Sequence, residues 1–96
     1  MEVILTDRFL TRVEECTDYI ALDDVPTAIK WAEDVIEYCE QLKTQPGSGR
    51  IVPEFNMREI KELIHGNYRL VYEVKSERVD MLTIWHTSQV LPEKPY

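Results

Sequence analysis

Residues 60–74 read IKELIHGNYRLVYEV, and this stretch decides how the second half of the chain folds. Two segments rich in branched and aromatic residues flank Gly66 and Asn67. Tight two-residue hairpin turns favour glycine and asparagine, because such turns require backbone with a positive φ angle. We therefore predict a β-hairpin with Gly66–Asn67 at its turn.

A second turn follows this hairpin. KSER, residues 75–78, separates YRLVYEV from VDMLTIWH, so three antiparallel strands in a meander are expected. Pairing Lys75 with Arg78 gives a trial register, although it places the like charges of Glu73 and Asp80 opposite each other. Upstream, IVPEF is extended and is interrupted by Pro53, which is typical of a sheet edge.

The trial register divides the last two strands between two faces of the sheet. One face is apolar enough to pack against helices, and the other is half apolar and half polar. Such a mixed face is typical of a surface that another molecule covers. The first face is predicted to carry Tyr68, Leu70, Tyr72, Met81, Thr83 and Trp85, and the second Arg69, Val71, Leu82, Ile84 and His86.

The first half of the chain predicts a short strand, EVIL, at residues 2–5 and then two amphipathic helices of about 16–18 residues each. Thr6 or Asp7 caps the first helix, and Asp24 caps the second, with Pro26 in its first turn. Charged residues off the apolar stripes, among them Arg12 and Glu15, are expected to be solvated. The stripes are Phe9, Val13, Cys16 and Ile20 in the first helix, and Ala28, Trp31, Ala32, Val35, Cys39 and Leu42 in the second.

These elements predict a single α+β domain over residues 1–96. It has a short N-terminal strand, an antiparallel helical hairpin and a three-stranded antiparallel meander. The hydrophobic fraction of 44% and the charged fraction of 30% are those of a soluble globular protein. Neither a signal peptide nor a long apolar run occurs in the sequence, so we expect a cytoplasmic protein without membrane contact.

The net charge of −7 comes entirely from residues 1–46, which carry four Lys/Arg and eleven Asp/Glu. This balance argues against a general nucleic-acid coat, which needs a basic surface, and we expect no direct sequence-specific binding of nucleic acid by the chain alone. The two histidines, His65 and His86, have no companion ligands at metal-binding spacing, and glycine-rich phosphate loops are absent. We therefore expect neither metal nor cofactor, and we expect Cys16 and Cys39 to be buried thiols.

Two stretches, GRIVPEF at residues 49–55 and GNYRLVYEV at residues 66–74, resemble the RelE/ParE toxin superfamily. The resemblance extends from about Leu5 to Pro92 and is to the ParE-like, plasmid-stabilisation branch. It implies the toxin of a type II toxin–antitoxin system, neutralised in a hetero-oligomer by a cognate, ParD-like antitoxin. ParE-like members act on DNA gyrase by docking, whereas RelE-like members are ribosome-dependent mRNA endonucleases.

The RelE-like enzymes use basic residues and a C-terminal tyrosine. Arg69 matches their arginine, but Gln89 falls where a second arginine is expected, and Glu62 falls where a lysine is expected. Tyr96 lies one residue from the position of the tyrosine. Metal-free RNA cleavage needs cations and proton donors; an amide does not replace them, and a carboxylate would repel phosphate. The resemblance therefore favours a gyrase inhibitor without catalytic residues. A RelE-like endonuclease and a non-toxic member that only binds antitoxin are the alternatives.

We expect the mixed face and the C-terminal tail to contact the target or the antitoxin. Arg69 either contacts such a partner or pairs with a carboxylate such as Glu62; in the first case, Arg69→Ala should lower toxicity with little loss of folding. Arg50 and Glu54 are predicted to form an ion pair that braces the loop after the second helix. The contact candidates are Arg69, Val71, Leu82, Ile84, His86, Gln89 and Tyr96.

Overall fold

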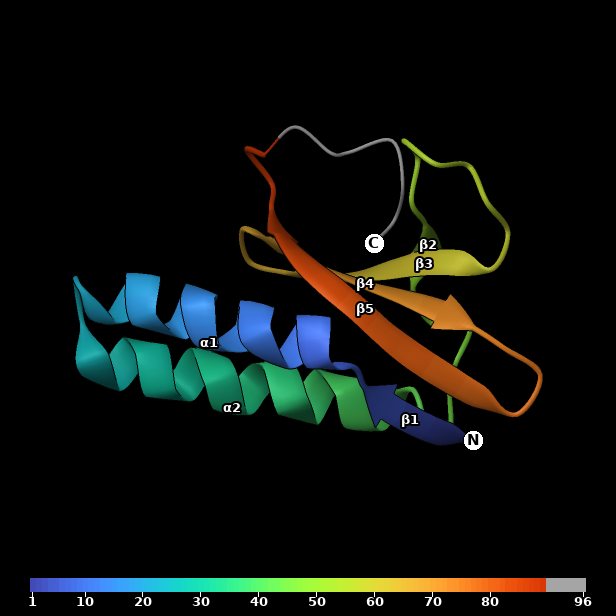
Figure 1. Cartoon of the computed structure of the whole chain (residues 1–96), viewed down its shortest axis with the longest axis horizontal. Helices are drawn as coiled ribbons and strands as arrows, with labels where there is room; N and C mark the ends of the chain where they lie inside the picture. Colours follow the sequence, from blue (N-terminus) through green and yellow to red (C-terminus); the bar gives the residue numbers. More distant parts are fainter. Residues whose placement is uncertain (90–96) are drawn as a thin grey trace.

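The computed structural model describes residues 1–89. Two helices pack on one face of a five-stranded sheet, whose strand order is β1-β5-β4-β3-β2 (Figure 1). The predicted α+β fold is confirmed, with β1 joining the meander as a strand parallel to β5. Within residues 1–89, neither helix has the length and apolar character that crossing a membrane requires. The elements are β1 (Glu2–Leu5), α1 (Asp7–Ala21), α2 (Val25–Gln41), β2 (Arg50–Ile51), β3 (Ile60–His65), β4 (Tyr68–Val74) and β5 (Arg78–His86).

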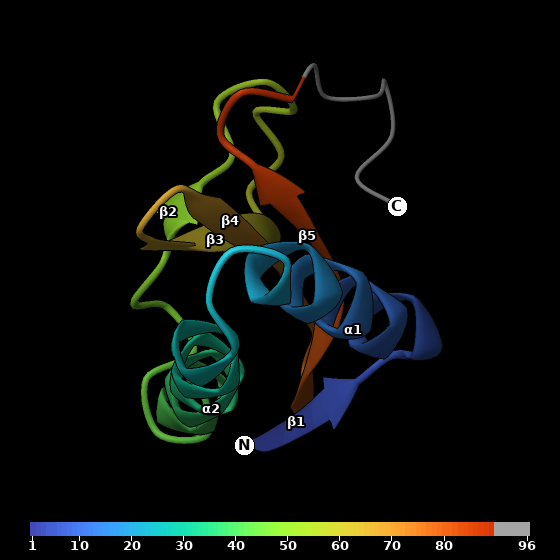
Figure 2. The ribbon, with the colours of Figure 1, turned by 90° about the vertical axis from the view of Figure 1, so that its left-hand side faces the viewer.

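The helices begin where their capping residues predict. The Thr6 hydroxyl accepts a hydrogen bond from the Phe9 amide at 3.2 Å and donates one to the Met81 carbonyl at 2.6 Å. The second bond fixes the start of α1 to β5. The Asp24 carboxylate accepts from the Thr27 amide at 3.3 Å at the start of α2. The two helices run antiparallel, and Figure 2 shows them from the end where the chain turns between them.

The main core lies between this helical hairpin and the sheet. Both predicted helix stripes contribute to it, and both cysteines are buried free thiols, as predicted. Removing this apolar surface from water supplies about 25 cal/mol per Å² and holds the hairpin on the sheet. The buried residues of this core are Phe9, Cys16, Trp31, Val35, Cys39, Leu42, Leu63, Leu70, Tyr72, Val79, Met81 and Ile84.

The predicted β3–β4 hairpin is confirmed. His65 pairs with Tyr68, and Gly66 has a φ of 58°, the left-handed conformation that glycine adopts without steric cost. The first part of the β4–β5 register is also confirmed, including the pairing of Glu73 with Asp80. Two cations offset this pairing of like charges, because the Asp80 carboxylate lies 3.2 Å from the Lys75 amine and 3.1 Å from the Arg78 guanidinium.

The rest of the β4–β5 register differs from the prediction because β5 contains a bulge. Tyr72 pairs with Met81 but Val71 pairs with Thr83, so Leu82 is an extra residue. An extra residue inverts the alternation of all side chains beyond it. The predicted faces of Thr83, Ile84, Trp85 and His86 are therefore wrong. Ile84 lies in the core below the helices, and Trp85 lies on the opposite face.

That opposite face is covered by the chain itself. Val52 and Phe55, from the loop between β2 and β3, pack on it, and the ring centroids of Phe55 and Trp85 are 5.8 Å apart. Val71 and Leu82 are buried in this second cluster. The prediction that these side chains present a surface to another molecule is therefore not met in this conformation. The second cluster comprises Val52, Ile60, Val71, Leu82, Trp85 and the partly buried Phe55.

Candidate functional site

Arg69 forms the centre of a buried ion-pair network on the face away from the helices. Its Nε donates to Glu62 at 2.6 Å, and its Nη1 and Nη2 donate to Glu54 at 2.8 and 2.7 Å. Glu62, whose side chain is completely buried, also accepts from Arg50 Nε at 2.7 Å. The pairing of Arg69 with Glu62 is therefore present.

The predicted ion pair between Arg50 and Glu54 is wrong, because each residue pairs with a different partner. The antiparallel register of β2 and β3 places Arg50 opposite Glu62. The loop that follows β2 brings Glu54 to Arg69 instead. The loop after the second helix is thus braced through β3 and β4, and not by a local contact.

Electrostatics in this network favour the charged forms of Glu54 and Arg69. Hydrogen bonds from Arg69 lower the pKa of Glu54 from 4.5 to about 2. The reciprocal bonds from Glu54, followed by those from Glu62, raise the pKa of Arg69 despite its burial. All three guanidinium nitrogens of Arg69 donate to carboxylates. Four of its five N–H groups donate to carboxylates, so the arginine is committed to the fold and its charge is already paired.

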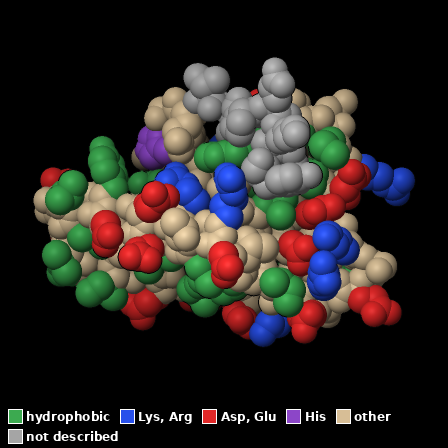
Figure 3. Space-filling view, viewed as in Figure 1, with side chains coloured by type: hydrophobic (Ala, Val, Ile, Leu, Met, Phe, Trp, Pro, Cys, Tyr) green, Lys and Arg blue, Asp and Glu red, His purple; other side chains and the backbone are tan. Residues whose placement is uncertain are grey.

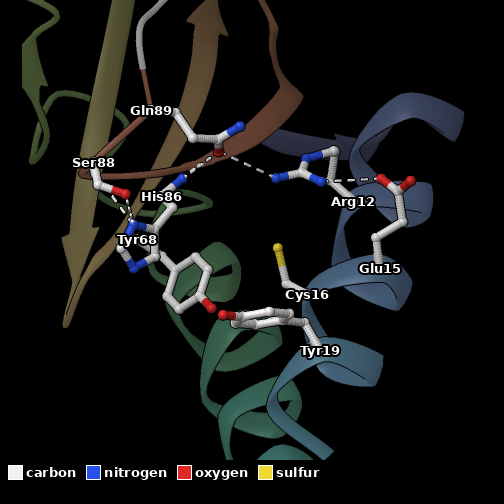
Figure 4. Close-up of a pocket in the computed structure, with 8 residues that line it drawn as sticks. All are labelled: Arg12, Glu15, Cys16, Tyr19, Tyr68, His86, Ser88 and Gln89. Atoms are coloured by element: carbon white, nitrogen blue, oxygen red, sulfur yellow. Dashed lines mark hydrogen bonds and ion pairs between the residues drawn. The ribbon is translucent and has the colours of Figure 1, made fainter. Parts of the chain in front are cut away.

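A recess of about 420 Å³ lies on the other side of the sheet, between α1 and the end of β5 (Figure 4). Four of its residues come from one flank of α1, where spacings of three and four residues align side chains. The others come from the start of β4 and from the end of β5 and the turn that follows it. The recess is lined by Arg12, Glu15, Cys16, Tyr19, Tyr68, His86, Ser88 and Gln89.

Arg12 joins α1 to the end of β5. Its Nε donates to the Ile84 carbonyl at 2.8 Å, its Nη1 to Glu15 at 3.0 Å, and its Nη2 to the Gln89 side-chain oxygen at 3.4 Å. The prediction that Arg12 is simply solvated is wrong, since its side chain is only 25% exposed. The sequence did contain a signal for this contact between α1 and β5. Arg12, Glu15 and Tyr19 lie beside the apolar stripe, and long amphipathic side chains in that position reach across to a neighbouring strand.

The turn after β5 fixes the hydrogen-bonding role of Nδ1 in His86. The Ser88 amide donates to Nδ1 of His86 at 3.1 Å, and the Ser88 hydroxyl lies 2.7 Å from the same nitrogen. An amide only donates, so Nδ1 carries the lone pair and the proton of the neutral ring is on Nε2. Gln89 closes the turn by accepting from the His86 amide at 2.7 Å. Nδ1 is therefore occupied and does not serve as a general base.

The recess combines aromatic and thiol side chains with the Arg12–Glu15 ion pair. Burial raises the pKa of the Cys16 thiol and that of the Tyr68 hydroxyl, so neither group is ionised at neutral pH. The Tyr68 ring packs edge-on against His86, with centroids 5.2 Å apart, and Tyr19 is largely exposed. A thiol held in its protonated form is a poor nucleophile. The recess is suited to holding a side chain of another molecule, with aromatic walls and a polar rim.

The structure separates the residues that the sequence analysis grouped as one contact region. His86 and Gln89 line the recess, while Ile84 contributes only its carbonyl oxygen to Arg12. Arg69, Val71 and Leu82 lie on the opposite face of the sheet. Tyr96 lies outside the described residues. In residues 1–89, three or more His, Cys, Asp or Glu side chains nowhere come together as metal ligands.

Comparison with known proteins identifies the family. The family model described as "ParE toxin of type II toxin-antitoxin system, parDE" matches residues 3–91. A solved structure titled "Chromosomal ParDE TA system from P. aeruginosa" shares the fold with a TM-score of 0.74 and 19% identity, covering 90% of this chain and 95% of that one. No curated protein sequence matches the chain. With a two-helix hairpin on a five-stranded sheet and a family match over nearly its whole length, the chain belongs to the ParE toxins of type II toxin–antitoxin systems.

Proposed function

We propose that this ParE-family chain acts in the cytoplasm as a docking toxin that inhibits DNA gyrase and that a cognate antitoxin neutralises. The observation that carries the proposal is the state of Arg69. All three nitrogens of its guanidinium are bound to Glu62 and Glu54 on the face away from the recess. A phosphorane that forms during RNA cleavage needs cations free to bind it.

The other positions of a RelE-like nuclease centre also carry unsuitable groups. Glu62 is a buried carboxylate, and its negative charge would repel phosphate. Gln89 is an amide whose oxygen is bound to the His86 backbone and lies near Arg12. The Gln89 amide does not transfer a proton at neutral pH, and Nδ1 of His86 is already hydrogen-bonded to Ser88. These side chains support inhibition by protein binding in preference to catalysis of RNA cleavage.

The recess between α1 and β5 supports docking in two ways. Tyrosine and arginine are among the residues that contribute most often to binding energy at protein interfaces, and Tyr19, Tyr68 and Arg12 line this recess. Its internal hydrogen bonds also hold the rim in place before a partner arrives, which lowers the entropic cost of binding. We propose that an apolar or aromatic side chain of the partner occupies it.

The antitoxin proposal follows from membership of the family, whose description names the paired system. We propose that an antitoxin segment orders on the toxin when it binds and covers the surface that the target needs. Neutralisation then results from competition for a shared surface. A hetero-oligomer of toxin and antitoxin is the resting form in this proposal.

The experiment begins with induction of the chain alone and together with the neighbouring open reading frame in bacteria. Growth arrest that co-expression relieves is expected. Purified protein should then lower supercoiling by gyrase and leave ribosome-bound transcripts intact. Tyr19→Ala should weaken gyrase inhibition at least tenfold, whereas Met57→Ala, an exposed apolar residue elsewhere, should not.

Three outcomes would overturn the proposal. Cleaved transcripts with normal supercoiling would establish the endonuclease. Normal growth without the neighbour would establish a non-toxic member. Gyrase inhibition that is equally strong in Tyr19→Ala and the unmodified protein would place the docking surface away from the recess.

A further inference from the structure

From its turn and along α2, the helical hairpin exposes large apolar side chains that the recess does not use. Leu22 is 86% exposed, Val25 55%, Ile29 54% and Ile36 37%. Val25, Ile29 and Ile36 are separated by four and seven residues, so they form one stripe along α2. Single exposed apolar residues are ordinary, but an aligned stripe continuous with a helix–helix turn indicates an interaction surface. We call these four residues and Asp23 the distal hairpin surface.

A second recess, of about 450 Å³, lies in this surface where the chain leaves α1. Tyr19, Ile20, Leu22 and Asp23 line it. Apolar walls with one carboxylate suit a lysine or arginine side chain, since its methylene stem packs on apolar groups while its charged head meets the carboxylate. The recess thus has room and chemistry for a cationic anchor.

The charge of the hairpin points to the same kind of partner. Residues 14–40 carry nine Asp/Glu and one Lys, a formal charge of −8, whereas the rest of the chain carries +1. The single lysine, Lys30, lies 3.2 Å from Asp34. Figure 3 shows acidic side chains interspersed with hydrophobic ones over the two helices. Since like charges across an interface repel, this surface disfavours a second copy of the same chain and favours a basic partner.

We propose that the distal hairpin surface docks a basic amphipathic helix of another protein. The apolar face of that helix covers Leu22, Val25 and Ile29, its Lys and Arg residues face the acidic flanks, and one of them enters the recess beside Asp23. The α2 stripe has the spacing of one helix face, so a helix laid along it meets apolar groups turn after turn. This inference concerns a second surface and does not depend on gyrase being the target.

The probe is a synthetic helix of about 18 residues, or five turns, with leucine at helical spacing and lysine elsewhere. A peptide of the same composition in scrambled order keeps the charge and removes the apolar face. Binding is measured by calorimetry, and the contact is mapped by amide chemical shifts of the labelled protein. The amphipathic peptide should bind at least tenfold more tightly than the scrambled one, with shifts concentrated in residues 14–40.

Variants measure the apolar contribution to binding. Leu22→Ser and Ile29→Ser should each weaken binding about tenfold. Met57→Ser, a matched control outside the surface, should leave it unchanged. Because these side chains are exposed, the variants should keep the thermal midpoint of the unmodified protein. Should one of them unfold more easily, the shift map of the unmodified protein decides the question.

Equal affinity for the two peptides would overturn the proposal, because attraction would then be by charge alone. Shifts centred on His86 and the end of β5 would overturn it as well, since the peptide would then occupy the recess of the proposed function. Absence of binding at low ionic strength would have the same consequence. Tyr19 lines both recesses, but the variants used here change Leu22 and Ile29, which do not line the first one, so the two proposals fail independently.

Discussion

Replacing Arg69 by alanine should strongly destabilise the fold. In the structure, Arg69 donates hydrogen bonds to Glu62 at 2.6 and 3.2 Å and to Glu54 at 2.8 and 2.7 Å. Glu62 has no exposed side-chain surface, so removal of the arginine leaves a buried carboxylate with Arg50 as its remaining cation. The side chain of Arg50 is 59% exposed, and water screens its charge.

The size of this loss of stability follows from the burial of Glu62. Breaking a buried ion pair by removing one partner costs about 3–5 kcal/mol, because the other charge remains desolvated. A domain of this size has a free energy of unfolding of about 5–10 kcal/mol. Arg69→Ala should therefore remove about half of the stability and lower the thermal midpoint by about 15–30 °C.

Two variants show whether the cause is the unpaired charge. Arg50→Gln removes an exposed partner and should cost only about 0–1 kcal/mol. The double variant Arg69→Met with Glu62→Leu removes both buried charges and should recover most of the loss. Unfolding in urea, followed by the fluorescence of the buried tryptophans Trp31 and Trp85, measures each free energy.

The reasoning is refuted if Arg69→Ala unfolds within about 1 kcal/mol of the unmodified protein, which is the range of an exposed ion pair. Normal stability together with lost toxicity or lost antitoxin binding would show that Arg69 contacts a partner. That was the alternative left open by the sequence. The structure favours the other alternative, in which Arg69 holds the β2–β3 loop on the sheet.

Three further predictions concern stability. Gly49→Ala should cost about 1–3 kcal/mol in urea unfolding, because the added methyl group would lie 2.6 Å from the Glu62 carbonyl oxygen and meet the Tyr72 hydroxyl; unchanged stability would contradict this contact. Thr6→Val should cost about 1–2 kcal/mol in the same assay by removing the cap of α1, whereas Thr6→Ser should not. Since the pKa of Glu54 falls from 4.5 to about 2 on folding, its contribution is complete above about pH 4.5 and is lost as the pH falls towards 2; a Glu54→Gln variant should show less acid dependence in this range.

Local features of the fold were predictable from the sequence. Thr6 and Asp24 cap their helices, and Gly66 occupies the hairpin turn with positive φ. Each of these features depends on residues only a few positions apart in the sequence, so the local sequence is enough to predict it. The apolar stripes of the two helices were predictable for a similar reason, because helical spacing alone assigns the buried face.

Features that depend on pairing between distant segments were not predictable. The bulge at Leu82 has no local signature in VDMLTIWH, and it moves Ile84 and Trp85 to faces opposite to those expected. Arg50 and Glu54 are close in sequence, but the register of β2 and β3 gives them separate partners. The reach of a helix side chain to a strand 72 residues later, as in the bond from Arg12 to Ile84, is likewise fixed only by packing.

The bulge has a consequence for the choice between docking and catalysis. Without it, Arg69 and His86 would share one face, and a cationic pocket with Gln89 beside them would be easy to assemble. With it, Arg69 faces Glu62 and Glu54 on one side of the sheet, while His86 and Gln89 face α1 on the other. Restoring arginine by Gln89→Arg would then place a second guanidinium near Arg12, where charge repulsion opposes it. A variant of this kind that gained RNA cleavage would contradict the separation of the two faces, because the sheet would have to rearrange to bring Arg69 to the same substrate.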